Sequence, residues 1–176
     1  MRAPDWAVGV CEGLAATGCG EVVYVPDNPL SHILRALADA HRGIRATLAT
    51  REEEAFGIAA GLYLGGARPA VMLQSSGLGN SLNALGSLLL PYEIPVLMLV
   101  SMRGEEHEWN AAQSPMGRAV RPILDAFALP HVVVPDAQSA RDVVRQAGDH
   151  AFVSRRPVAC LLPRSLTNFS TPGGVE

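Results

Sequence analysis

Cysteine and aromatic residues are scarce in this chain, and each shortage excludes a class of protein. Only 3 of the 176 residues are cysteine, an odd number, and they show no C-x-x-C spacing. A disulfide framework and a zinc site are therefore not expected, and no metal ligands are assigned to this chain. The low aromatic content of 5% goes together with 17 glycines, a combination that favours close packing of small side chains.

An excess of basic charge and a long apolar run are also missing. The formal net charge is −3, whereas a nucleic-acid-binding domain usually carries a basic face. No apolar stretch reaches the length of a membrane span, and Pro4, Asp5 and Glu12 interrupt the start, where a signal peptide would be apolar. We expect a cytoplasmic protein that binds neither nucleic acid nor membrane, with one domain over residues 1–165 and a tail over 166–176.

Short apolar, often β-branched segments alternate with helical patterns along the whole chain. The segments predicted as strands are 21–25, 43–49, 68–74, 94–101, 131–135 and 157–163. This alternation predicts an α/β fold with a doubly wound, six-stranded parallel sheet and helices on both faces, as in flavodoxin. Ligands of such sheets bind at the carboxyl ends of the strands. The candidate contacts therefore lie in the loops after strands, at 25–32, 50–54, 75–80 and 102–116.

Three consecutive glutamates stand at the start of the third predicted helix, in "TREEEAFGIAAG". Thr50 and Glu53 have the spacing of a capping box, and Glu52 and Glu54 also favour the positive end of the helix dipole. All three glutamates are thus compatible with a purely structural role. The glycines that follow each cost about 1 kcal/mol relative to alanine in a helix. Such a cost is accepted where a ligand or another backbone approaches closely, which makes a carboxylate here a candidate site residue.

Several strings together resemble a known family. The pattern E-x-x-A-x-x-x-A-x-G from Glu52 to Gly61, then "SSGLGN", then "EIPVLMLVSMRG" is similar to the pyrimidine-binding domain of thiamine diphosphate-dependent decarboxylases. The resemblance extends over roughly residues 5–165. Within the family, "YVPDN", "SSGLGNSLNAL" and "AQSPMGRA" look most like the alpha subunits of sulfopyruvate decarboxylases. Phosphonopyruvate decarboxylases are a close second.

The resemblance implies a catalytic role for one of the three glutamates. In this family a glutamate hydrogen-bonds a ring nitrogen of the cofactor's aminopyrimidine and so promotes loss of a proton from the thiazolium carbon. Counting back nine residues from Gly61 selects Glu52. The loop at 75–80 is expected to pack near the pyrimidine ring. Gln74, Ser75 and Gly77 would then contact the cofactor, and Asn80 would be the N-cap of the following helix.

Two loops hold the candidate substrate contacts. Asn28 is favoured in the stiff loop 25–32, because the neighbouring Asp27 would repel an anionic 2-keto acid. In the long loop 102–116 the family position favours Gln113. Arg103 and Arg118 carry the planar fork that suits a sulfonate or a phosphonate. The alternative for both arginines is salt bridging with the loop's own glutamates, which contributes little at a surface.

The motif that binds magnesium and diphosphate in this family, G-D-G with a later asparagine, is absent; "GD" occurs only at Gly148–Asp149, inside a predicted helix. The resemblance therefore implies a beta subunit that binds the diphosphate and Mg²⁺ of thiamine diphosphate. We expect a hetero-oligomer with two or more copies of each chain, which decarboxylates 3-sulfopyruvate to sulfoacetaldehyde and CO2. The small-residue segments 55–61 and 79–87 would face the partner or a second copy. Alternatives are phosphonopyruvate decarboxylase, a nucleotide-binding flavodoxin-like module, or a non-catalytic regulatory subunit.

Overall fold

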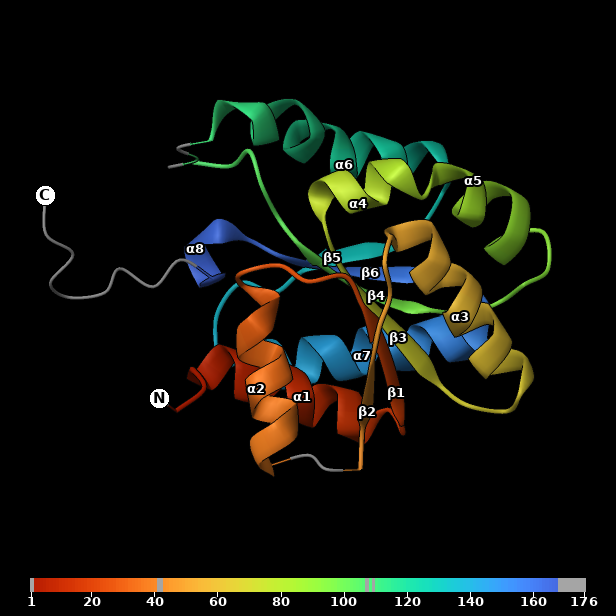
Figure 1. Ribbon diagram of the computed structural model, residues 1–176, viewed down its shortest axis with the longest axis horizontal. Helices are drawn as coiled ribbons and strands as arrows, with labels where there is room; N and C mark the ends of the chain where they lie inside the picture. The colour runs from red at the N-terminus through yellow and green to blue at the C-terminus, as the bar shows by residue number, and fades with distance from the viewer. Residues whose placement is uncertain (1, 41–42, 107, 109, 168–176) are drawn as a thin grey trace, which may run out of the picture.

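The strands in the described part of the chain lie in one parallel sheet, and helices cover both of its faces (Figure 1). The computed structural model describes residues 2–40, 43–106, 108 and 110–167. The sheet has six strands in the order β2-β1-β3-β4-β6-β5, which confirms the predicted fold class. The strands are β1 (Glu21–Tyr24), β2 (Arg45–Leu48), β3 (Pro69–Gln74), β4 (Leu97–Ser101), β5 (His131–Val133) and β6 (Val158–Leu162).

Helices connect the strands and begin and end the described chain. They are α1 (Asp5–Ala16), α2 (Leu30–Ala40), α3 (Glu52–Leu64), α4 (Ser75–Asn80), α5 (Leu82–Ala84), α6 (Ser114–Ala126), α7 (Ala140–Ser154) and α8 (Arg164–Thr167). A π-helical turn, η1, spans Leu85–Leu89, and a 3₁₀ turn, η2, spans Ala111–Gln113. None of the helices in the described residues is both long and apolar enough to cross a membrane.

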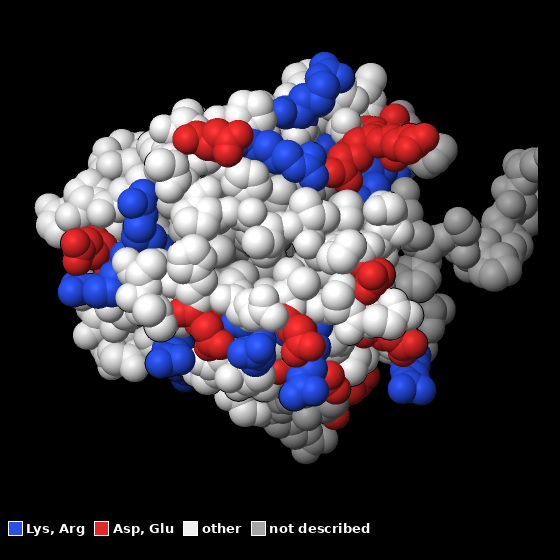
Figure 2. Space-filling model, turned by 180° about the vertical axis from the view of Figure 1, so that it is seen from behind, with Lys and Arg blue, Asp and Glu red and all other residues white. Residues whose placement is uncertain are grey.

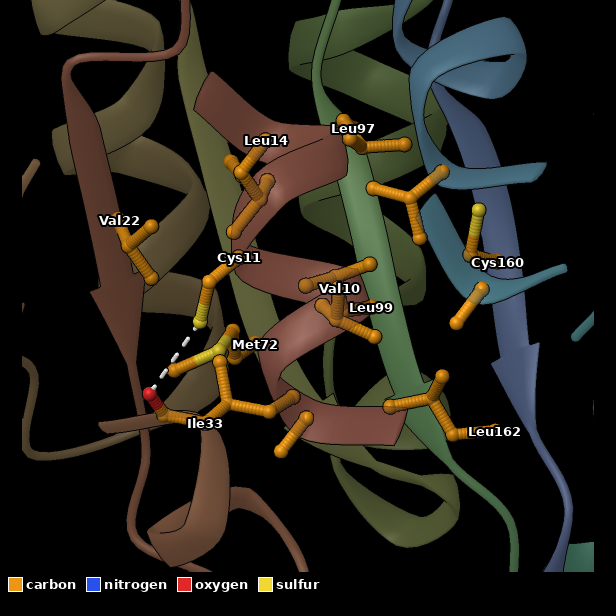
Figure 3. Close-up of a cluster of buried hydrophobic side chains, with 14 of the residues drawn as sticks. Val10, Cys11, Leu14, Val22, Ile33, Met72, Leu97, Leu99, Cys160 and Leu162 are labelled. Atoms are coloured by element: carbon orange, nitrogen blue, oxygen red, sulfur yellow. Dashed lines mark hydrogen bonds between the residues drawn. The ribbon is translucent and has the colours of Figure 1, made fainter. Parts of the chain in front are cut away.

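Side chains on the two faces of the sheet belong to two separate hydrophobic cores. Figure 3 shows the first, in which Val10, Cys11 and Leu14 of α1 pack against strand side chains such as Leu99 and Cys160. The second core lies between the other face of the sheet and helices α3, α4 and α6, with η1. Because side chains alternate in direction along a strand, a sheet covered on both faces needs the continuous apolar runs seen in the sequence.

The order of the strands places a switch point between β1 and β3. The chain passes from β1 to β2 on one side, and then crosses back over β1 to form β3 on the other side. At such a point the two neighbouring connections diverge, and a crevice opens at the carboxyl ends of the strands. The turn after β1 and the start of α4 after β3 therefore flank the expected ligand crevice.

Two segments predicted as loops are partly or wholly helical. The segment "SSGLGN" is not a loop, because α4 begins directly after β3, and Asn80 ends that helix instead of capping the next one. The predicted loop 102–116 ends early, since η2 and then α6 take up its last residues. Of the predicted tail, α8 includes Leu166 and Thr167, both buried, and residues 168–176 lie outside the described residues.

Charges of both signs are intermixed on the face seen from behind in Figure 2. Charged side chains border a broad uncharged area on this face, and no basic patch gathers on it.

Candidate functional site

The carboxyl ends of the strands bring polar side chains from five connections to one edge of the sheet. Asp27 follows β1, Glu52 follows β2, Ser75 follows β3, Arg103 follows β4, and Arg164 follows β6. The register fixes this edge, because Gln74 at the end of β3 pairs with Ser101 at the end of β4, which pairs with Leu162 of β6. Residues far apart in sequence can therefore act on one ligand here.

Glu52 is directed from the first turn of α3 onto the backbone of α4. A Cβ atom built at Gly77 would lie 2.4 Å from Glu52 Cγ and 2.5 Å from Glu52 Oε1. Glycine at position 77 is thus what allows the carboxylate to lie against this helix. Asn80 Nδ2 donates a hydrogen bond to Glu52 Oε2 at 3.3 Å, which orients the carboxylate from the last residue of α4.

The other two glutamates have roles opposite to those expected. Thr50 donates to Glu54 Oε2 from its backbone amide at 2.7 Å and from its hydroxyl at 2.6 Å. These hydrogen bonds lower the pKa of Glu54 below its usual value. Glu53 instead forms an exposed ion pair with Arg51 at 3.4 Å. The predicted pairing of Thr50 with Glu53 is wrong because Arg51, not Thr50, is the N-cap of α3, so the helix starts one residue later.

Gln74 and Ser75 occupy the turn from β3 into α4, beside the switch point. Gln74 Oε1 is buried and has no hydrogen-bond partner among the described residues. Such an orphaned acceptor indicates a place for a ligand's donor group. Ser75 is fully buried, and its hydroxyl accepts from the Arg103 amide at 2.9 Å and donates to the Ser101 carbonyl at 3.4 Å. Its hydroxyl therefore holds the end of β4 in place.

A charge pair closes the same edge between the turn after β1 and the loop after β4. Arg103 Nη2 forms an ion pair with Asp27 Oδ1, and the two side chains are 17% and 7% exposed. The Ser101 hydroxyl donates to Asp27 Oδ2 at 2.6 Å. The charge of Asp27, which the sequence reasoning treated as repelling an anion, is paired with that of Arg103. Arg103 Nε is buried and has no hydrogen-bond partner in the part of the chain that the structure describes.

The remaining predicted substrate contacts lie around this cluster. Asn28 is exposed, next to Asp27, and its carbonyl accepts from the Ser31 hydroxyl at 2.6 Å. Gln113 is half-buried at the end of η2. Arg118 is exposed on α6. Arg103, in contrast, is held at the carboxyl edge of the sheet by its ion pair with Asp27.

Two residues of the site were not proposed as site residues from the sequence. Ser101 is the last residue of β4, so the rule that ligands bind at the carboxyl ends of strands could have identified it. Asn80 was assigned as a cap because glycine-rich strings usually form loops. The contact between Asn80 and Glu52 depends on two helices packing together, and no local pattern signals it.

Comparison with known proteins identifies the family of this chain. The family described as "Thiamine pyrophosphate enzyme, N-terminal TPP binding domain" matches residues 6–116. The chain belongs to this family, as the resemblance predicted. It is 39% identical over 158 residues to the "Sulfopyruvate decarboxylase subunit alpha" of Methanothermobacter thermautotrophicus, covering 90% of this chain and 95% of that protein.

A more distant relative and a solved structure extend the comparison. The "Phosphonopyruvate decarboxylase" of Streptomyces viridochromogenes is 32% identical over 91% of this chain, which spans 41% of that protein. In structure, a 2-oxoglutarate:ferredoxin oxidoreductase from Magnetococcus marinus superposes with a TM-score of 0.77 at 18% identity. That match covers 92% of this chain and 29% of the oxidoreductase, and it supports the fold.

Proposed function

We propose that this chain is the alpha subunit of a thiamine diphosphate-dependent sulfopyruvate decarboxylase. It would convert 3-sulfopyruvate into sulfoacetaldehyde and CO2 together with a beta subunit. The observation that carries the proposal is the placement of Glu52 over Gly77 at the switch-point edge of the sheet, in a chain of this family. The 39% identity to a sulfopyruvate decarboxylase alpha subunit supports this substrate over phosphonopyruvate.

The residues at the edge fit the aminopyrimidine half of thiamine diphosphate. When bound, the cofactor supplies the electron sink for decarboxylation. The Glu52 carboxylate would share a proton with a ring nitrogen, and Asn80 holds that carboxylate in orientation. Gln74 Oε1, which is buried and unpaired within the described residues, would accept a hydrogen bond from the amino group. Ser75 and Gly77, both buried in α4, would contribute by shaping that helix next to the cofactor.

The anionic tail of the substrate would lie against Arg103. The ion pair of Arg103 with Asp27 has no net charge. Attraction of the substrate's anionic tail therefore depends more on hydrogen bonds from the Arg103 N–H groups than on net charge. Arg103 Nε is a buried donor with no partner in the described chain, and a sulfonate oxygen would satisfy it. Asn28, in the turn after β1, and Gln113, at the end of η2, would contact the keto acid. Arg118 stays a candidate for an outer contact.

The diphosphate and Mg²⁺ would be bound by the beta subunit. The G-D-G string is missing from this chain, which spans 41% of the phosphonopyruvate decarboxylase relative. The surface of α3 supports docking of a partner, because a Cβ atom at Gly57 or Gly61 would meet no atom within 4 Å. Leu48 and Leu64 nearby are 60% and 76% exposed. Three unpaired cysteines fit a cytoplasmic location for the hetero-oligomer.

The test is reconstitution with a candidate beta subunit, a chain with G-D-G and a downstream asparagine encoded by the adjacent reading frame. The complex should decarboxylate sulfopyruvate faster than phosphonopyruvate, and this chain alone with thiamine diphosphate and Mg²⁺ should be inactive. Robust activity of the isolated chain would overturn the two-subunit proposal. A nucleotide-binding module would instead bind its ligand alone, and a regulatory subunit would show activity that is independent of Glu52.

A further inference from the structure

The loop that follows β4 is organised around a buried carboxylate, that of Glu108. Its side chain is 4% exposed, and Arg164 Nη1, on a side chain 6% exposed, lies 3.1 Å from Glu108 Oε2. The same carboxylate accepts from the backbone amides of Gly104 and Asn110, each at 3.1 Å. Glu108 therefore has three donors from three places in the chain, including α8 after β6.

These hydrogen bonds close the segment that carries two of the proposed substrate contacts. Gly104 directly follows Arg103, and Asn110 is the N-cap of η2, which ends at Gln113. Asn110 Oδ1 accepts from the Ala112 amide at 3.2 Å and so starts that turn. The Glu108 carboxylate thus joins the two ends of the segment between Arg103 and Gln113, and a change in its position would move both.

The closed segment is also packed tightly against α6. A Cβ atom at Gly117 of α6 would lie 1.7 Å from the Arg103 carbonyl oxygen. Gly104 has a φ of +69°, and a Cβ atom there would lie 2.7 Å from Ser114 Cα. The left-handed backbone at Gly104 turns its amide in a way that few other residues accept. Glu108 therefore holds a backbone conformation that the surrounding packing also requires.

Neighbouring charges fix Arg164 from a second direction. The backbone amide of Arg164 donates to Glu105 Oε2 at 2.9 Å, and Arg121 of α6 lies 3.5 Å from Glu105 Oε1. The start of α8 is thereby joined to the same loop through two carboxylates. Since α8 directly follows β6, these contacts fix the loop relative to the sheet as well as to α6.

We propose that Glu108 and Arg164 are positioning residues that hold Arg103 and Gln113 in the geometry for substrate binding. The inference rests on the proposed function. A carboxylate is required because both of its oxygens accept hydrogen bonds. In glutamine, the amide NH2 group would face one of the existing donors. Arg164 would act through Glu108 and would not itself contact the substrate.

The experiment uses the reconstituted complex with Glu108→Gln, Arg164→Lys and the double variant Glu108→Gln/Arg164→Gln. Glu108→Gln should raise the KM for sulfopyruvate at least about tenfold and change kcat less, the scale of a lost charge-assisted hydrogen bond. Hydrogen–deuterium exchange at the thiazolium carbon should stay normal, because Glu52 is untouched. Arg164→Lys keeps the charge and should retain part of the affinity.

Two further measurements separate positioning from general instability. Amide hydrogen exchange should rise in the peptide 103–113 and stay unchanged in β1 and β3. The double variant, which removes both members of the Glu108–Arg164 ion pair, should recover stability relative to Glu108→Gln but not KM. Glu93→Gln, which removes an exposed ion pair with Arg155, is the control and should behave as wild type. A wild-type KM together with unchanged exchange in 103–113 would overturn the proposal. If the wild-type complex decarboxylates no keto acid, the proposed function fails, and exchange in 103–113 still decides the role of Glu108.

Discussion

The side chain of Glu52 occupies the space that a Cβ atom at Gly77 would need, with Glu52 Cγ 2.4 Å from that position. The two residues come from different helices and different connections of the sheet. Real Cβ atoms essentially never approach a neighbour this closely, so any side chain at position 77 must displace the carboxylate. The position of the proposed catalytic group is therefore coupled to the absence of a side chain on α4.

Gly77→Ala should consequently impair the chemistry of Glu52 without changing Glu52 itself. In the reconstituted complex, exchange of the thiazolium proton should slow by up to about 10²–10⁴-fold, which is the usual contribution of one general acid–base group. The measurement is exchange of the thiazolium proton in D2O, stopped by acid and followed by NMR. Gly20→Ala is the matched control, since a Cβ atom there would meet nothing within 4 Å. Equal rates for both variants would show that Glu52 does not depend on this contact.

The three adjacent glutamates should separate cleanly in the same assay. Glu52→Gln cannot share a proton in the same way and should slow thiazolium exchange by roughly 10²–10⁴-fold. Glu53→Gln should leave exchange intact, because Glu53 only pairs with Arg51 at the surface. Glu54→Gln weakens the hydrogen bonds from Thr50 and should lower the melting temperature slightly, with normal exchange. Normal exchange in Glu52→Gln with loss in either neighbour would mean that the family register is misassigned.

The sequence predicted the central strands well because β3, β4 and β6 are nearly continuous apolar runs, as burial on both faces of the sheet demands, whereas the edge strands β2 and β5 are largely exposed. The spacing to Gly61 in the family pattern selects Glu52, and the structure places its side chain against Gly77 of α4. The errors arose where tertiary packing decides. Thr50 could pair with a glutamate three or four residues on, and the true start of α3 selects Glu54. The ion pair of Asp27 with Arg103 joins residues 76 positions apart, and no local pattern encodes it.

Arg103→Ala should weaken substrate binding more than it slows turnover. Loss of one charge-assisted hydrogen bond costs about 1.5–3 kcal/mol, which corresponds to at least about a tenfold rise in KM for sulfopyruvate. Arg118→Ala should have a much smaller effect, since Arg118 is exposed on α6 and outside the cluster of Asp27 and Arg103. Steady-state kinetics of the two complexes provide the comparison. A normal KM in Arg103→Ala would place the anion site elsewhere, on the beta subunit.

The cysteine thiols should react slowly in the folded chain, and their ionisation should lower the stability of the fold at alkaline pH. Burial raises the thiol pKa of Cys11 and of Cys160 to about 12, and that of Cys19 to about 11. At pH 8 iodoacetamide should therefore label the native chain far more slowly than the chain in urea. Because the folded pKa values lie above the ordinary thiol value of about 9.0, the folded state keeps its thiol protons to a higher pH than the unfolded chain does. Its stability should fall as the pH rises from about 9 towards 12. Rapid native labelling would contradict this burial.

The open face of α3 yields a prediction with opposite signs in the isolated chain and in the complex. Gly57→Ala and Gly61→Ala have room for the added methyl group, since a Cβ atom at either position meets no atom within 4 Å. Each substitution should stabilise the isolated chain by about 0.5–1 kcal/mol, because alanine loses less conformational entropy than glycine in a helix. Urea unfolding of the isolated chain measures this gain.

In the complex the same methyl groups should be harmful if the beta subunit packs against α3. Overpacking a close contact costs about 1–3 kcal/mol, so the dissociation constant for the beta subunit should rise by about fivefold or more. Titration calorimetry with the purified beta subunit measures it. Glu12→Ala, on the exposed side of α1 and so on the other face of the sheet, should leave the dissociation constant unchanged. Gly57 and Gly61 variants that gain stability yet bind the beta subunit as tightly as wild type would exclude α3 from the subunit interface.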